Sequence, residues 1–580
     1  MYDNLHKLEK YLFDILSATL VLFYSYSAVL TPASTEYHRG IYAVITYVLV
    51  FLVYKSRSWW MRIADYVMIV LSAISIGYWI FNFEAINYRT GAETDLDKLI
   101  AMVGVLLGVE VARRVVGNVF VILGAVMLLY GVFGDYMPEL FSHAGDTFPD
   151  LCTSIFYKSD GVFGIMANVL ATYVLLFVLF GAFLEQSGAQ KFFIDFPLAA
   201  VGHKVGGPGK VSVIASGLFG SISGSAIANT VSTGAFTIPM MKKAGFPPHM
   251  AGGIEPAASI GGMFMPPIMG AGGFIMAEMT GVPYSQIMLV SLFPAIMYFF
   301  SVFVMVHYEA KKLNIVGEKS EQNALEILKK EWYYTLPLVV ITIFMLVGYS
   351  PGYSAILGIG ACIAVSWLNK ETAIGPREFV AAARAGTVNS LTIGATVGVI
   401  GIIIGVLTYS GLVLTFADIV IELAAGRLVL TIILIALASL VLGMGVPVTA
   451  AYLITAVVAV PALTHLGVNE IAAHMIVYWL SQDSNITPPV CIAAFAGATI
   501  AKANMWKTAF TSFKFAKFLY LGPFLFGYVP GFTLNGTPRD IITSFVMIFI
   551  GTWLYSWFLS GIWIGTLRQY FRKKGTSNAD

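Results

Sequence analysis

The stretch GSISGSAIANTVSTGAFTIPMMKKAGFPPHMAGGIEPAASIGGMFMPPIMGAGGFIMAE, residues 220–278, decides the fold of this chain. Its pattern of helix-breaking glycine and proline residues recurs in residues 442–501. Four helix-breaking residues recur 222 positions later: Pro239 as Pro461, Gly245 as Gly467, Pro266 as Pro488 and Pro267 as Pro489. Each copy has a glycine-rich break in one apolar run and a Pro-Pro break in the next. Paired interruptions in matching hydrophobic segments are typical of the binding site of a secondary transporter.

The composition is that of a membrane protein. The chain has 580 residues, of which 58% are hydrophobic and 11% charged. Soluble domains carry about 25% charged residues, and many apolar runs here approach the roughly 20 residues that cross a bilayer. We therefore predict an all-α polytopic membrane protein that has the lipid bilayer, and no nucleic acid, as a partner. Cys152, Cys362 and Cys491 are too few for a disulfide framework.

Two hairpins that enter the membrane and return are predicted from the charge pattern. Residues 211–241 contain no charged side chain, yet Lys210 precedes them and Lys242 and Lys243 follow them. By the positive-inside rule this segment enters and leaves on the cytoplasmic side, with its tip near residues 221–225. The related segment 428–460, with its tip near residues 443–447, is expected to enter from the outside. Opposite entry is what an inverted-topology repeat requires.

The basic residues also orient the rest of the chain. They gather at the start, after the second apolar run and after the fourth, so we expect the N-terminus in the cytoplasm. Basic residues at 568–574 place the C-terminus there too. An acidic stretch at 135–160 fits an external loop. We predict a small N-terminal membrane unit with a connecting helix at residues 1–148, a transport unit at 149–535 with repeats 149–348 and 349–535, and a C-terminal helix and cytoplasmic tail at 536–580.

The breaks indicate cation sites. Non-helical backbone at membrane depth is tolerated where it is buried in protein or lines a polar cavity, and carbonyl, hydroxyl and amide oxygens there suit a cation such as Na⁺. The first predicted Na⁺ site comprises Ser221, Ser225, Asn229, Ser259, Gly262 and Met265. Its pseudo-symmetric mate comprises Gly443, Gly445, Thr449, Asp483, Asn485 and Thr487. The alternative is that these small residues only let helices pack closely.

An anionic substrate is expected to use the same breaks, because half-helix N-termini supply partial positive charge. The predicted substrate contacts are Ser223, Ser225, Pro266, Pro267, Pro447 and Pro488. Two acids lie in largely uncharged surroundings. Asp483 has either a role in cation or proton coupling or a structural hydrogen-bonding role, whereas Glu255 is expected to brace the start of a helix.

No enzyme signature is present. The run KVGGPGKV at residues 204–211 lacks the Ser/Thr after Lys210 and the first glycine of a phosphate loop. No zinc-protease motif or nucleophile elbow occurs. We expect a non-enzymatic protein without a cofactor or a metal other than Na⁺. Transport would then be driven by an ion gradient or would be passive.

At these residues the sequence resembles the membrane component of tripartite ATP-independent periplasmic (TRAP) transporters. The opening stretch resembles the signature of the large subunit. The segments SQDSNITPPV, residues 481–490, and DTFPDLCTSIFYKSDGVFGIMANVL, residues 146–170, resemble the fused type that pairs with a TAXI-class binding protein. The resemblance covers nearly the whole chain.

This resemblance implies an elevator-type ion transporter with inverted repeats and two re-entrant helical hairpins, plus a fused N-terminal four-helix unit. It implies Na⁺-driven uptake of a small organic acid, of the dicarboxylate or 2-oxo acid class, across a bacterial or archaeal inner membrane. A soluble TAXI-type periplasmic protein would deliver the substrate, and we expect a monomer, with a dimer as the alternative. Two other functions are open: a stand-alone Na⁺/carboxylate elevator transporter and a passive channel.

Overall fold

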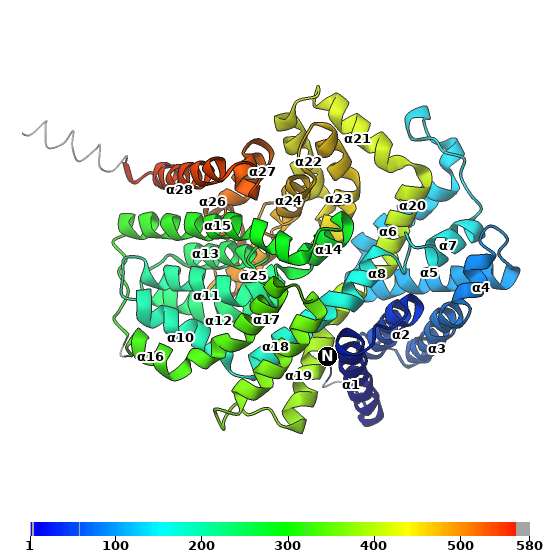
Figure 1. Ribbon diagram of the computed structural model, residues 1–580, viewed down its shortest axis with the longest axis horizontal. Helices are drawn as coiled ribbons and strands as arrows, with labels where there is room; N and C mark the ends of the chain where they lie inside the picture. The colour runs from blue at the N-terminus through cyan, green and yellow to red at the C-terminus, as the bar shows by residue number, and fades with distance from the viewer. Residues whose placement is uncertain (1, 3–4, 57, 321, 564–580) are drawn as a thin grey trace, which may run out of the picture. The chain divides into compact units, whose positions relative to one another are not determined.

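A computed structural model describes residues 2, 5–56, 58–320 and 322–563 (Figure 1). The described residues form helices joined by turns, with one isolated antiparallel bridge between Val205 and Val316. Nine helices in this part of the chain are long and apolar enough to cross a membrane. The predicted all-α polytopic fold is therefore confirmed. The basic residues at 568–574 lie outside the described residues, so the orientation of the C-terminus stays a prediction.

The chain forms two compact units, and each is assembled from three stretches of sequence. Unit 1 comprises Met1–Gly188, Ala271–Ser285 and Thr335–Glu470. Unit 2 comprises Ala189–Gly270, Gln286–Tyr334 and Ile471–Asp580. The division follows packing, because a helix joins the unit whose helices it contacts, wherever it stands in the sequence.

Unit 1 contains the helices of the N-terminal block and the second hairpin. Its helices are α1 (Lys7–Val29), α2 (Thr35–Val53), α3 (Trp59–Phe81), α4 (Phe83–Tyr88), α5 (Asp95–Val115), α6 (Asn118–Val132), α7 (Phe148–Tyr157), α8 (Ile165–Val169), α9 (Leu175–Gln186), α14 (Gly270–Thr280, from its second residue), α17 (Leu336–Val347), α18 (Pro351–Ser366), α19 (Pro376–Gly394), α20 (Val397–Ser410), α21 (Leu412–Leu423), α22 (Leu428–Leu442) and α23 (Val448–His465). Helix α21 was not predicted from the sequence.

Unit 2 contains the first hairpin and most of the C-terminal helices. Its helices are α10 (Ala189–Val201), α11 (Gly207–Ser223), α12 (Ala226–Lys243), α13 (Pro248–Gly261), α15 (Tyr284–Lys312), α16 (Ala324–Glu331), α24 (Glu470–Leu480), α25 (Ile492–Ala501), α26 (Met505–Phe515), α27 (Phe518–Tyr528) and α28 (Pro538–Ser560). The first residues of α15 and α24 still belong to unit 1.

The two predicted repeats have the same order of elements. In the first, the hairpin α11–α12 is followed by α13, a break and α14; in the second, α22–α23 is followed by α24, a break and α25. The turns of both hairpins fall within the predicted tips, at residues 224–225 and 443–447. Each break contains a Pro-Pro pair, and the peptide bond within each pair is cis.

Local sequence explains the first hairpin. Pro208 stands in the first turn of α11, where its missing N–H costs nothing. The helix ends at Gly224, whose φ of 61° favours glycine. Ser225 then caps α12, because its hydroxyl accepts a hydrogen bond from the N–H of Ala228 at 3.3 Å. The Ser-Gly-Ser run is therefore a turn between two helices.

Buried ion pairs hold the N-terminal block of unit 1 together, where α2, α3 and α5 pack on one another (Figure 1). The carboxylate of Asp65 on α3 is fully buried and lies 2.6 Å from Arg114 and 3.2 Å from Arg62. Arg62 also pairs with Glu9 of α1. A more exposed pair, Asp14 of α1 with Arg384 of α19 at 2.8 Å, ties this block to a later helix of the same unit.

Candidate functional site

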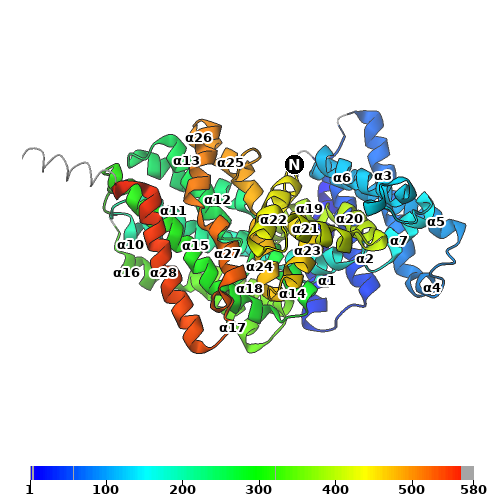
Figure 2. The ribbon, with the colours of Figure 1, turned by 90° about the horizontal axis from the view of Figure 1, so that it is seen from above.

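The tip of the first hairpin meets the first break inside unit 2. Helices α11 and α12 pack on each other and on α13, which α25 and α26 also contact (Figure 2). A Cβ atom added to Gly262 would lie 2.5 Å from the carbonyl carbon of Gly220, and one added to Gly220 would lie 2.5 Å from Nδ2 of Asn229. Only glycine fits at this approach. The structure thus brings Asn229 and Gly262, two residues of the first predicted site, to the same place against Gly220.

The other residues of the first predicted site surround this contact. Ser221 is buried, and its hydroxyl donates to the carbonyl of Leu218 at 2.8 Å. Ser259 is buried one turn before the break. Ser223, Ser225 and the run from Met265 to Pro267 are half-buried in the same unit.

The first break exposes carbonyl oxygens to a neighbouring tyrosine. The hydroxyl of Tyr478, on α24, lies 2.7 Å from the carbonyl oxygen of Met263 and 2.6 Å from that of Met269. A phenol has one proton, so it donates to one of these oxygens at a time. Tyr478 therefore positions both ends of the break while lone pairs of the carbonyls remain available to a ligand.

Glu255 lies in the middle of α13, so the prediction that it braces the start of a helix was wrong. Its carboxylate is fully buried between the two arms of the first hairpin. Four hydroxyl groups donate to it, two from α11 and two from α12. The donors are Ser212 and Ser216, each at 2.5 Å, and Thr233 and Thr237.

The sequence held a signal for this cluster that was not used. Ser212 and Ser216 stand four residues apart, as do Thr233 and Thr237, and positions four apart share one face of a helix. Two such hydroxyl pairs in the uncharged stretch 211–241, followed by a lone acid at Glu255, indicate a buried carboxylate with hydroxyl donors.

The second break contains buried polar atoms without partners. Asp483 is 3% exposed, and its Oδ1 receives no hydrogen bond from any described residue. Gln482, which the sequence analysis did not single out, is fully buried, and neither atom of its amide group has a partner among those residues. Burying such groups alone is costly, which makes Asp483 and Gln482 candidates to hold a ligand.

Two further predicted residues of this break have partners. The amide of Asn485 donates to the carbonyl of Gln482 at 3.3 Å. The hydroxyl of Thr487 lies 2.5 Å from that of Tyr520. Pro488 is half-buried.

The tip of the second hairpin belongs to unit 1, whereas the second break belongs to unit 2. Gly443 is buried, Gly445 has a φ of 76°, and Pro447 precedes α23. Thr449 is buried, and its Oγ1 has no hydrogen-bond partner in the part of the chain that the structure describes. It is thus another hard oxygen with free lone pairs.

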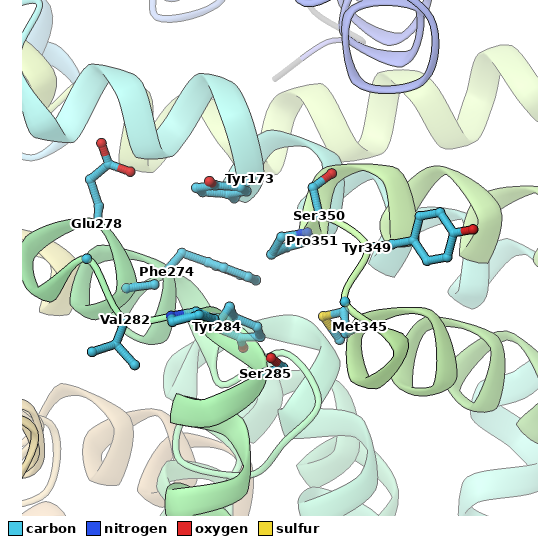
Figure 3. Close-up of a pocket in the computed structure, with 14 residues that line it drawn as sticks. Tyr173, Phe274, Glu278, Val282, Tyr284, Ser285, Met345, Tyr349, Ser350 and Pro351 are labelled. Carbon is cyan, nitrogen blue, oxygen red and sulfur yellow. The ribbon is translucent and has the colours of Figure 1, made fainter.

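Unit 1 also contains a cavity of about 650 Å³ where α14 ends, α15 begins and α17 turns into α18. In Figure 3 the rings of Tyr173, Phe274 and Tyr284 lie close together along it. Phe274 stacks on Tyr284 with ring centres 4.3 Å apart. Glu278 lies at one side, and its carboxylate accepts a hydrogen bond from Asn168 at 2.8 Å. None of the predicted site residues lines this cavity.

Comparison with known proteins gives a family match over most of the chain. Residues 103–532 match the family described as tripartite ATP-independent periplasmic transporter, DctM component. The 2,3-diketo-L-gulonate TRAP transporter large permease protein YiaN of Escherichia coli is 25% identical over 61% of this chain and 83% of its own. The C4-dicarboxylate TRAP transporter large permease protein DctM of Rhodobacter capsulatus is 34% identical over 20% of this chain and 29% of its own.

The fold also resembles that of solved structures. The crystal structure of the YdaH transporter of Alcanivorax borkumensis, described as having an unusual topology, covers 72% of this chain and 98% of its own. The TM-score is 0.50 and the sequence identity 17%, so this likeness concerns the fold alone.

Proposed function

Because the chain belongs to the DctM family of tripartite ATP-independent periplasmic transporters, we propose that it takes up a small organic acid in symport with Na⁺. It is a multi-pass membrane permease, and the relatives are permeases rather than enzymes. We place it in the bacterial or archaeal inner membrane with both termini in the cytoplasm. The proposed mechanism is an elevator motion, and the proposed organisation is the division at residues 148 and 535 given above.

The buried, unpartnered carboxylate oxygen of Asp483 carries the proposal of Na⁺ coupling. An ionised carboxylate in an apolar interior needs hydrogen bonds, an opposite charge or a coordinated cation. Intramembrane acids are by default functional candidates. Gln482 beside it adds a neutral amide oxygen without a partner among the described residues. Hard oxygen ligands of this kind suit Na⁺, with no need for a soft or nitrogen donor.

The substrate is proposed to be an anion that is bound without an arginine or lysine side chain as its partner. No lysine or arginine occurs in residues 244–310 or 428–501. The negative charge would be balanced by bound Na⁺ and by the N-terminal end of α12, at Ser225. Relatives named for C4-dicarboxylate and 2,3-diketo-L-gulonate support an organic acid as the substrate class.

Delivery by a soluble TAXI-type binding protein is proposed from the resemblance of residues 146–170 and 481–490.

Uptake into proteoliposomes tests the whole proposal. Purified full-length protein is reconstituted, and uptake of labelled dicarboxylates and 2-oxo acids is measured with an inward Na⁺ gradient, or an equal K⁺ gradient, with and without the candidate binding protein.

We expect uptake only when the Na⁺ gradient and the binding protein are both present. Uptake with Na⁺ alone would favour the stand-alone elevator transporter, and uptake independent of both would favour a passive channel. Either result would contradict the proposed function.

A further inference from the structure

Glu255 is the only formally charged side chain in residues 244–277, and no charge occurs in residues 211–241. The arms of the first hairpin pack on α13 and carry basic residues only at their outer ends. Lys210 lies 3.2 Å from His307, Lys242 donates to the carbonyl of Ala501, and Lys243 pairs with Glu318. A buried carboxylate that no basic residue of these segments can pair with must be held by hydrogen bonds. The hydroxyl cluster supplies four donors, an arrangement that stabilises the ionised form of this carboxylate within the hairpin assembly.

The two carboxylate oxygens face different surroundings. Oε2 accepts from Ser212 and Thr237. Oε1 accepts from Ser216 and Thr233, and the hydroxyl of Ser259 lies 3.5 Å from it. Ser259 is a predicted cation ligand one turn before the break. Oε1 is therefore the oxygen that faces the candidate cation site.

This arrangement determines which lone pairs are free. A hydroxyl has one proton, so a Thr233 that donates to Glu255 donates neither to the backbone carbonyl of Asn229, at 2.7 Å, nor to its Oδ1, at 3.3 Å. The amide nitrogen of Asn229 is fixed because it donates to the carbonyl of Ser216 at 3.0 Å. Oδ1 of Asn229 thus keeps its acceptor capacity, and a Ser259 hydroxyl turned toward Glu255 likewise presents its lone pairs elsewhere.

We propose that Glu255 is a positioning residue of the first cation site: it does not ligate Na⁺, but its charge attracts the ion and its hydrogen bonds aim the oxygens of Asn229 and Ser259 at it. The inference rests on the proposed Na⁺ coupling and deepens it. A glutamine at this position removes the charge and introduces an N–H donor, so some hydroxyls must reverse and direct their protons toward the site.

The test measures the Na⁺ concentration that gives half of the maximal thermal stabilisation of the purified full-length protein, at constant ionic strength with K⁺ as replacement. Glu255→Gln is expected to raise this concentration about tenfold or more, because two opposite charges in a weakly polar interior attract strongly. The same shift is expected in the Na⁺ dependence of uptake into proteoliposomes.

A matched pair on α12 keeps the proposal testable if Glu255→Gln does not fold. Thr233→Val and Thr237→Val each remove one buried hydroxyl from the same carboxylate, one at Oε1 and one at Oε2. Both changes are expected to lower the unfolding temperature, whereas only Thr233→Val is expected to raise the half-saturating Na⁺ concentration.

An equal effect of the two valine variants on Na⁺ dependence would overturn the inference. So would an unchanged half-saturation in Glu255→Gln, and if wild-type uptake still required Na⁺ in that case, the proposed function would stand. Absence of any Na⁺ effect on wild-type stability and uptake would refute the coupling and the inference together.

Discussion

Replacing Gly262 with alanine tests whether the first hairpin tip and the first break form one site. The backbone of Gly262 is helical, with φ of −60° and ψ of −29°, so alanine introduces no backbone strain. Its Cβ would meet the carbonyl carbon of Gly220 at 2.5 Å, where ordinary contact begins at 3.4 Å. Helices α11 and α13 must therefore separate by about 1 Å, and overpacking of this kind costs about 1–3 kcal/mol.

This separation is expected to distort the cation site. Na⁺ affinity then drops roughly tenfold to a hundredfold, since about 1.4 kcal/mol corresponds to a factor of ten. The assay is Na⁺-dependent uptake into proteoliposomes, together with the unfolding temperature. Gly360→Ala is the control, because a Cβ at Gly360 meets nothing within 4 Å and alanine favours a helix. Wild-type Na⁺ affinity and stability in Gly262→Ala would refute the reasoning.

Three further changes probe other features. Asp483→Asn should abolish Na⁺-dependent uptake while binding-protein-independent leakage stays unchanged, and full Na⁺ dependence in this variant would remove Asp483 from the coupling site. Tyr478→Phe should lower the free energy of unfolding by about 1–2 kcal/mol, because a buried carbonyl of the first break loses its donor; an unchanged unfolding temperature would contradict this. Asp65→Asn should cost about 2–3 kcal/mol, because buried charge-assisted hydrogen bonds are lost although Arg62 and Arg114 keep Glu9 and Glu110 as partners. Asp14→Asn, in a pair that is 24–30% exposed, should cost about 1 kcal/mol or less; equal unfolding temperatures of the two variants would show that burial does not set the difference.

The helices and hairpin tips were predictable because their signals are local. Uncharged apolar runs, the lysines at their ends and the Gly, Ser and Pro residues between them define where each helix begins and ends. The turn at Gly224 and Ser225 falls where the Ser-Gly-Ser run predicted it. Helix α21 was missed because its twelve residues, Leu412–Leu423, follow α20 after a single glycine and contain two acids.

Long-range packing could not be predicted in the same way. The environment of Glu255 depends on side chains from α11, α12 and α13 that converge only in space. Next to Pro256 in the sequence, the acid was more simply explained as a helix brace. The grouping of α22 and α23 with the N-terminal helices in unit 1 likewise depends on contacts between segments far apart in the chain.

The interleaving of the two units has a consequence for biosynthesis. Each unit takes its last stretch from residues beyond 334, and the stretch of unit 2 that begins at Ile471 is synthesised after all of unit 1. Domains generally fold as units during synthesis, the N-terminal one first. In this chain neither unit is whole before residue 470 has been synthesised, so folding of the first unit must wait until most of the chain has been made. The early helices therefore stay in the bilayer without their final packing partners until the later segments have been synthesised.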